Sequence, residues 1–167
     1  MCSSDLMGGI LVIPQGLINQ TTGIGTFCVD ATVRKRVEMI AQNLVMETEC
    51  GFGHIVEDVS AKKCGWDVTA RIPVQPGSTT VFEPRHIEVK GREKGADTIT
   101  LTNNEICYAV NQKDKYILAI VLVDGDKTEG PFYIPHPFDK ELDPDDVSVN
   151  KNLQSLLDRA VRPEETL

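Results

Sequence analysis

The sequence predicts an α/β sandwich in which helices flank a mixed central β-sheet. Three observations predict this class: a long stretch of helical periodicity comes first, several stretches with strand-like alternation follow, and a second helix then precedes two further strands. With 167 residues and 41% hydrophobic side chains, the chain can form one compact domain with a substantial core. We expect this domain at residues 30–161, after a leader at residues 1–29 that ends an upstream region, and before a frayed tail at residues 162–167.

The first predicted helix covers residues 31–50. Apolar residues recur in it three and four positions apart, Asp30 is suited to be its N-cap, and Gly51 ends the pattern. Because the apolar positions share one side, we expect this amphipathic helix to pack on a sheet.

The strand predictions begin after this helix, where the hydrophobic period changes to two. Residues 54–59 form a short strand candidate, and residues 66–72 alternate, with Trp66 and Val68 on the apolar face. A turn region rich in proline and glycine then leads to the sequence IEVK at residues 87–90. An antiparallel hairpin is the simplest connection between these two strands.

The next elements are a strand, a helix and a strand. Residues 97–101 predict the first strand, and Thr102 and Glu105 fit a capping box that opens a helix of about three turns through Gln112. The nearly all-apolar stretch at residues 115–123 predicts a strand that is buried on both faces.

The last elements are an edge strand and a short helix. Prolines bracket residues 131–135, which predicts an edge strand because proline cannot donate to a sheet ladder. The final helix is expected within residues 150–161.

The sequence IEVK carries the candidate chemistry. Side chains alternate along a strand, so Glu88 and Lys90 project to one face, opposite Ile87 and Val89. In the expected hairpin, Asp67 projects to that face from the neighbouring strand. Two carboxylates suit a hard divalent cation, and the carbonyl of Val89 can add a third oxygen ligand. Lys90 then lies within reach of a scissile phosphate or of the attacking water.

Several residues near this cluster have simpler interpretations. Charge alternation on a solvent-facing strand is the alternative for Glu88 and Lys90. The capping box explains Glu105 by itself, so we assign it no catalytic role. His86 abuts the cluster in sequence and is interpreted as a surface histidine, although it could assist proton transfer.

The blocks GWDV and IEVKG resemble the D…ExK core of the PD-(D/E)xK nuclease-like superfamily, with Trp66 in place of the proline that conventionally precedes the aspartate. More specifically, residues 33–157 resemble the NO VEIN-type C-terminal domain found at the C-terminal end of large Swi/Snf-like and other superfamily 2 helicases. The resembling segments are EDVSAKKCGWDVTAR, HIEVKGREKGADTITLTNNEICYA and KYILAIVLVDG, followed by PFYIPHPF and SVNKNLQSLL.

This resemblance implies a restriction-endonuclease-like sandwich and a set of roles for the cluster. Asp67 and Glu88 are implied as ligands of Mg²⁺ or Mn²⁺ and as catalytic residues, together with the carbonyl of Val89 as a ligand. Lys90 is implied as the catalytic lysine. A fold of this kind does not by itself establish cleavage.

The resemblance also implies residues outside the cluster. Many nuclease relatives place a glutamate on the first helix, facing the metal. Glu38 is our choice for this catalytic role and Glu47 is its rival, because the register of the helix is open in the sequence. The basic residues expected to follow a DNA backbone are Arg71, Arg85, Arg92 and Lys94.

Two functions follow from the resemblance. The first is a helicase-associated nuclease-like domain that acts on DNA, with metal-dependent phosphodiester hydrolysis. The alternative is a catalytically inactive DNA-binding or helicase-docking module of the same fold. The sequence contains no Walker-type GxxxxGK[ST], so the helicase or ATPase region is expected elsewhere on the same chain or on a partner chain.

Charge and cysteine content limit the surroundings of the protein. The net charge of −8 argues against a sequence-blind nucleic-acid binder held by its global field, although residues 62–94 carry seven bases against four acids. The five cysteines are widely spaced without a CxxC pair, which favours reduced thiols and a cytoplasmic protein. The longest apolar run, Ile117 to Val123, is too short to span a bilayer, so no membrane partner is expected.

Overall fold

The structure is a computed structural model that describes residues 31–75 and 78–167. Its centre is a five-stranded sheet in the order β1-β2-β3-β5-β6. The strands are β1 (Ile55–Asp58), β2 (Val68–Val74), β3 (Val81–Glu93), β5 (Tyr116–Asp124) and β6 (Lys127–Pro135). Strands β3 and β5 are parallel and the other neighbours are antiparallel, so the predicted mixed sheet is confirmed.

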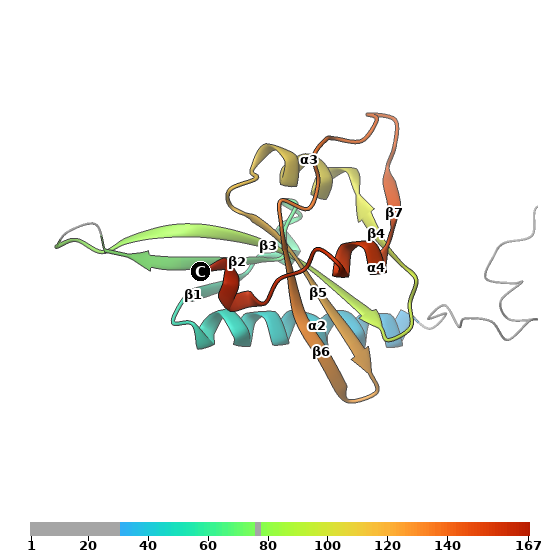
Figure 1. The fold of residues 1–167 in the computed structure, drawn as a ribbon, viewed down its shortest axis with the longest axis horizontal. Coiled ribbons are helices and arrows are strands. Elements are labelled where there is room, and N and C mark those ends of the chain that lie inside the picture. The colour runs from blue at the N-terminus through green and yellow to red at the C-terminus, as the bar shows by residue number, and fades with distance from the viewer. Residues whose placement is uncertain (1–30, 76–77) are drawn as a thin grey trace, which may run out of the picture.

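Helices lie on both faces of this sheet (Figure 1). Helix α2 (Ala31–Gly51) covers one face, and its buried side chains join the core beneath β3 and β5. The opposite face carries α3 (Asn103–Asn111), α4 (Leu153–Leu157) and a small sheet of β4 (Thr98–Thr102) and β7 (Ser148–Asn152). The short 3-10 turns are η1 (Ser60–Lys62) and η2 (Pro163–Thr166).

Helix α2 approaches β3 closely at Gly91, where the sequence IEVK ends. A Cβ atom added to Gly91 would lie 2.7 Å from the carbonyl oxygen of Val37 and 3.0 Å from the side chain of Ala41. The first distance is shorter than real Cβ contacts and the second is very tight, so the helix can take this position only over a residue without a side chain. Gly91 thereby holds the back of β3 against the helix, while Glu88 and Lys90 point to the opposite face.

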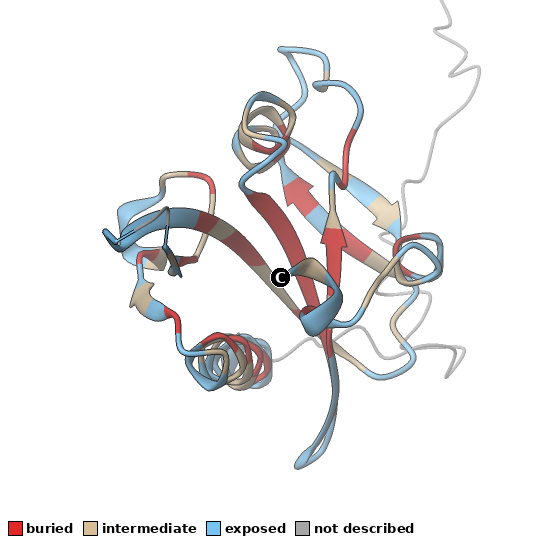
Figure 2. Cartoon of the chain, turned by 60° about the vertical axis from the view of Figure 1, so that its left-hand side comes forward, coloured by how far each residue is buried: buried red, intermediate tan, exposed pale blue. Residues whose placement is uncertain are grey.

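Strand β5 separates two hydrophobic cores. Ile117 and Ala119 belong to the core under α2, whereas Leu118 and Ile120 belong to the core under α3 and α4. Figure 2 shows the middle of the sheet as a continuous buried region between these two layers. The prediction of a strand buried on both faces is therefore confirmed.

Several other predicted elements are also confirmed. The first helix, the β2–β3 hairpin and the capping box at Thr102 are present, and β6 lies at an edge of the sheet. The strand predicted at residues 97–101 corresponds to β4, which pairs with β7 outside the main sheet. The expected leader and the proposed N-cap Asp30 lie outside the described residues. Residues 163–166, expected to fray, form η2. No described helix is long and apolar enough to cross a membrane.

One expectation about local structure is wrong. Trp66 does not share a face with Val68, because β2 begins only at Val68 and the indole turns toward the core under α3. The final helix, expected within residues 150–161, is confirmed as α4, which begins after residues 150–152 have paired with β4 as the end of β7. The side chain of Asn152 then accepts a hydrogen bond from the backbone N–H of Ser155 at 2.8 Å and starts α4.

Candidate functional site

Asp67 is anchored at the point where β2 begins beside β3. The hairpin pairs Val68 with Ile87, and the N–H of Asp67 extends the ladder by donating to the carbonyl of Ile87 at 3.0 Å. The carboxylate of Asp67 accepts a hydrogen bond from the N–H of Val89, also at 3.0 Å. Its side chain is therefore fixed at the edge of β3 beside Glu88, as the hairpin predicted.

Glu88 and Lys90 lie on the face of β3 that looks toward α3. The ammonium nitrogen of Lys90 is 2.7 Å from Oε1 of Glu88 and 2.8 Å from Oε2 of Glu105. The three side chains are between 5 and 15% exposed, so this is a largely buried ion triad rather than a solvated strand surface. The structure thus brings together Asp67, Glu88 and Lys90 and adds Glu105 to them.

Glu105 has two functions in the fold, of which the sequence indicated one. Its Oε2 accepts the N–H of Thr102 at 3.2 Å, and its own N–H donates to Oγ1 of Thr102 at 3.3 Å, which completes the capping box. The same Oε2 also binds Lys90. A carboxylate can accept several hydrogen bonds, so a complete local explanation does not exclude a second partner. We refer to Asp67, Glu88, Lys90 and Glu105 as the carboxylate–lysine cluster.

This cluster holds three carboxylates against one ammonium. Burial, assisted by the nearby charges of Asp67 and Glu105, raises the pKa of Glu88 to about 8, although Lys90 opposes the shift. Burial also raises the pKa of Asp67 against the opposing effects of the Val89 N–H and Lys90. Burial acts to lower the pKa of Lys90, but the two glutamates outweigh it and raise that pKa. Lys90 therefore stays charged while Glu88 holds its proton readily.

The donor set of the cluster fits a hard divalent cation. Asp67 and Glu88 supply carboxylate oxygens. Val89 lies beyond the last residue of β3 that pairs with β2, and its N–H donates to Asp67. The Val89 carbonyl is on the same edge of β3, which makes a set of two carboxylates and one carbonyl. In the described part of the chain, no three His, Cys, Asp or Glu side chains are arranged as a metal site, so such a cation would need further oxygens from water or substrate.

An aromatic group borders the cluster. The ring of Trp66 stacks on His86 and Tyr108, with centroids 4.3 and 4.4 Å apart, and Oη of Tyr108 lies 2.6 Å from Nδ1 of His86. Burial, with a smaller effect from Lys115, lowers the pKa of His86. His86 is thus a half-buried, stacked residue, and its interpretation as a surface histidine is wrong.

The first helix does not bring Glu38 or Glu47 to the cluster. Helix α2 packs on the opposite face of β3, and both glutamates are exposed. The buried glutamate of this helix is Glu49, which continues the four-residue spacing of the buried positions Val37, Ala41 and Val45. That spacing could have predicted that Glu49 is buried, because residues four positions apart lie on the same face of a helix.

Glu49 is the centre of a second buried ionic group. Its Oε1 accepts hydrogen bonds from Arg85 at 3.2 Å and from Oη of Tyr133 at 2.9 Å, and its Oε2 lies 2.7 Å from Nδ1 of His54. Arg85 also donates to the carbonyl of Thr166 at 2.5 Å, which ties η2 to the sheet. We call these residues the Glu49 cluster.

The four basic residues expected to contact DNA each have a partner within the chain. Arg85 is buried in the Glu49 cluster, whereas Arg71 and Lys94 form exposed ion pairs. Exposed pairs contribute about 0–1 kcal/mol and can open at little cost, so these two side chains stay available to a ligand. The partners are Glu57 for Arg71, Glu49 for Arg85, the carbonyl of Thr98 for Arg92, and Glu129 for Lys94.

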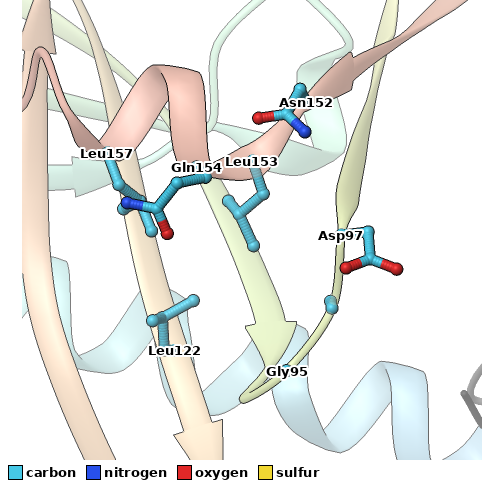
Figure 3. A pocket seen from close by; sticks show the side chains of 8 residues that line it. Gly95, Asp97, Leu122, Asn152, Leu153, Gln154 and Leu157 are labelled. Atoms are coloured by element: carbon cyan, nitrogen blue, oxygen red, sulfur yellow. The ribbon is translucent and has the colours of Figure 1, made fainter.

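A pocket of about 260 Å³ lies apart from both ionic groups, between the β3–β4 turn and the start of α4 (Figure 3). Leu122, Leu153 and Leu157 give it an apolar floor, and Asp97 is the charged residue in its lining. None of its lining residues belongs to the carboxylate–lysine cluster. The candidate chemistry therefore does not lie in this hollow.

The fold and site define a class: an α/β domain with a mixed sheet and a buried acidic cluster around a lysine. The family model described as Protein NO VEIN, C-terminal matches residues 37–134. This match covers more than half of the chain and includes the whole carboxylate–lysine cluster, so the chain belongs to that family. The comparison with curated proteins gave no match, and neither did the comparison with solved structures.

Proposed function

We propose that this chain is a helicase-associated, nuclease-like domain that hydrolyses phosphodiester bonds of DNA with Mg²⁺ or Mn²⁺. The observation that carries this proposal is the convergence of Asp67, Glu88 and Lys90 on one face of the sheet, where Asp67 also accepts the N–H of Val89. A mixed sheet with helices on both faces is compatible with the endonuclease-like sandwich that the resemblance implies. The site rather than the fold carries the functional argument.

Asp67 and Glu88 are the residues that would hold the cation, together with the Val89 carbonyl. When bound, a divalent cation polarises a phosphoryl oxygen and lowers the pKa of a water molecule. The excess of carboxylates over cationic side chains supports this assignment. Positive charge at the site would relieve the repulsion that contributes to the raised pKa of Glu88.

Lys90 is the residue that would act on the substrate. Glu88 and Glu105 keep its ammonium charged, so it can donate a hydrogen bond to the attacking water or to a non-bridging oxygen of the phosphate. Hydrolysis forms one P–O bond to the water oxygen, breaks the P–O bond to the leaving sugar oxygen, and transfers a proton to that oxygen. Glu105 acts through Lys90, whose ammonium it holds 2.8 Å away, and is a positioning residue.

A cleavage assay tests this proposal. Purified protein is incubated with single- and double-stranded DNA and Mn²⁺, and the wild type is compared with Asp67→Ala, Lys90→Ala and the control Lys35→Ala. Loss of a preorganised charged donor lowers rates by about 100-fold or more, so we expect this loss for Lys90→Ala. Lys35 is exposed on α2, which covers the face of β3 opposite the cluster, so its variant should keep cutting. Metal-dependent cleavage that survives both Asp67→Ala and Lys90→Ala contradicts the proposal.

The second candidate is an inactive module that binds DNA or docks on a helicase region. The observation in its favour is that Lys90 already has two carboxylate partners, which a substrate phosphate must compete with. A wild type that binds DNA or the helicase region without cutting, with Mn²⁺ present, would select this candidate. A parent protein whose DNA binding and motor activity are unchanged when residues 30–161 are deleted would reject it.

A further inference from the structure

Tyr116 carries a buried hydroxyl that lacks a protein partner. Among the described residues, Oη of Tyr116 is the buried side-chain oxygen or nitrogen atom without a hydrogen bond. The residue is 1% exposed. Buried tyrosines ordinarily place this hydroxyl against an acceptor, and Tyr133 does so with Glu49 in the other core. The orphaned hydroxyl therefore needs an explanation.

The position of Tyr116 directs that hydroxyl to the carboxylate–lysine cluster. Tyr116 pairs with His86, and Leu118, two residues along β5, pairs with Glu88. Tyr116 and Glu88 are thus diagonal neighbours on the same face of adjacent strands, a spacing that a tyrosine ring can bridge. The Tyr108 ring lies 6.0 Å away and closes the other side. Burial, with smaller effects from the nearby carboxylates of Glu88, Glu105 and Asp67, raises the pKa of the phenol.

A neutral phenol can donate one hydrogen bond, and the hydroxyl of Tyr116 needs an acceptor for it. One enclosed water molecule satisfies this arrangement, because it accepts from the hydroxyl and donates to a carboxylate. Buried waters ordinarily bind polar groups that would otherwise be unsatisfied. A group that donates a hydrogen bond to a metal ligand, without binding the metal itself, fixes the orientation of that ligand.

We propose that Tyr116 is a positioning residue of this site, whose hydroxyl donates through one enclosed water to the carboxylate of Glu88 and so orients that carboxylate for a divalent cation. The cation in this inference rests on the proposed function, whereas the water-mediated hydrogen bond between Tyr116 and Glu88 does not. The matched control is Tyr108, whose hydroxyl bonds to His86 instead. Both Tyr→Phe variants remove one hydroxyl and keep the ring.

The first experiment is a high-resolution crystal structure of the metal-free wild type. We expect an ordered water within hydrogen-bonding distance of both Oη of Tyr116 and the carboxylate of Glu88. A hydroxyl that contacts no water, or a water that does not reach Glu88, overturns the inference whether or not the protein binds metal.

The second experiment measures Mn²⁺ binding to the wild type, Tyr116→Phe and Tyr108→Phe by titration calorimetry. Loss of an outer partner of a metal ligand weakens binding 10- to 100-fold, so we expect about tenfold for Tyr116→Phe and no change for Tyr108→Phe. Equal affinity for the wild type and Tyr116→Phe refutes the positioning role. A wild type that shows the bridging water but does not bind Mn²⁺ refutes the metal-dependent function and leaves the hydrogen bond established.

Discussion

The two faces of β3 carry two buried ionic groups of opposite balance. On the α2 face, the Glu49 cluster gives one carboxylate three partners: Arg85, Tyr133 and His54. On the α3 face, the carboxylate–lysine cluster gives one ammonium three acidic neighbours. The first group satisfies its charge within the chain, whereas the second leaves negative charge in excess.

This difference separates a group that stabilises the fold from one suited to a ligand. A buried charge with a full set of partners holds elements together, and Arg85 uses it to connect β3, α2 and η2. A buried charge without enough partners lowers the stability of the fold, and unpaired charges of this kind are commonly found at sites that bind ligands. The acidic excess at Glu88 is therefore the stronger functional indication of the two.

The largest expected effect on stability is at Glu49. Glu49→Ala leaves Arg85 buried without its carboxylate, which we expect to lower the free energy of unfolding by about 3–5 kcal/mol. Urea denaturation measures this change. The control is Glu47→Ala on the same helix, where the residue is exposed and the change should stay within about 0.5 kcal/mol. Equal losses for the two variants would show that the Glu49 cluster is not stabilising.

Glu88 should show the opposite behaviour. Its pKa of about 8 lies above the 4.5 of a glutamate free in water, so the folded state binds the proton more tightly than the unfolded state. This contribution to stability is complete below about pH 4.5 and is lost as the pH rises through 8. In EDTA, Glu88→Gln should therefore gain stability over the wild type between pH 5 and 9, on the order of 3 kcal/mol. Parallel denaturation curves for the two proteins across this range would contradict it.

The two buried tyrosines give a smaller and more direct comparison. Tyr133 donates to Glu49 at 2.9 Å, so Tyr133→Phe removes a buried hydrogen bond to a charged group and should cost about 1.5–3 kcal/mol. Tyr116 has no acceptor among residues 31–75 and 78–167, so Tyr116→Phe should cost less than about 1 kcal/mol. Thermal unfolding of both variants tests the order, and a larger loss at Tyr116 would reverse it.

The smallest expected effect is at Glu105. Glutamine also serves at this position of a capping box, so Glu105→Gln should change stability by less than about 0.5 kcal/mol while Lys90 loses one carboxylate. The control is Thr102→Ala, which removes the cap and should cost about 1 kcal/mol. Urea denaturation and the cleavage assay together separate the two roles. A glutamine variant as unstable as Thr102→Ala would mean that the ion pair with Lys90 contributes most of the stability at this position.

The sequence predicted the part of the site that depends on local geometry. Alternation along β3 places Glu88 and Lys90 together, and the short hairpin brings Asp67 beside them. The first placement depends on alternation within one strand and the second on one hairpin. In both, a side chain can point only to one of the two faces of the sheet. The capping box at Thr102 is equally local.

The sequence did not predict which distant residues meet the site. Glu38 was chosen on the first helix, but α2 packs on the face of β3 opposite the cluster and buries Glu49 instead. Arg85 was expected to contact DNA, yet it lies on the same face as Ile87 and pairs with Glu49. Both misplacements arise because the layer that covers each face of a sheet is decided by packing between distant segments.

The sequence by itself determined the order of the elements as far as β6, the hairpin and the shared face of Glu88 and Lys90, because these follow from backbone periodicity and turn residues. Only the tertiary structure decided that α3 covers this face, that Glu105 meets Lys90, and that Tyr116 lies diagonally across from Glu88 on adjacent strands. Those contacts join segments that are far apart in the chain. Their geometry depends on how two cores fill around β5, which no local pattern encodes.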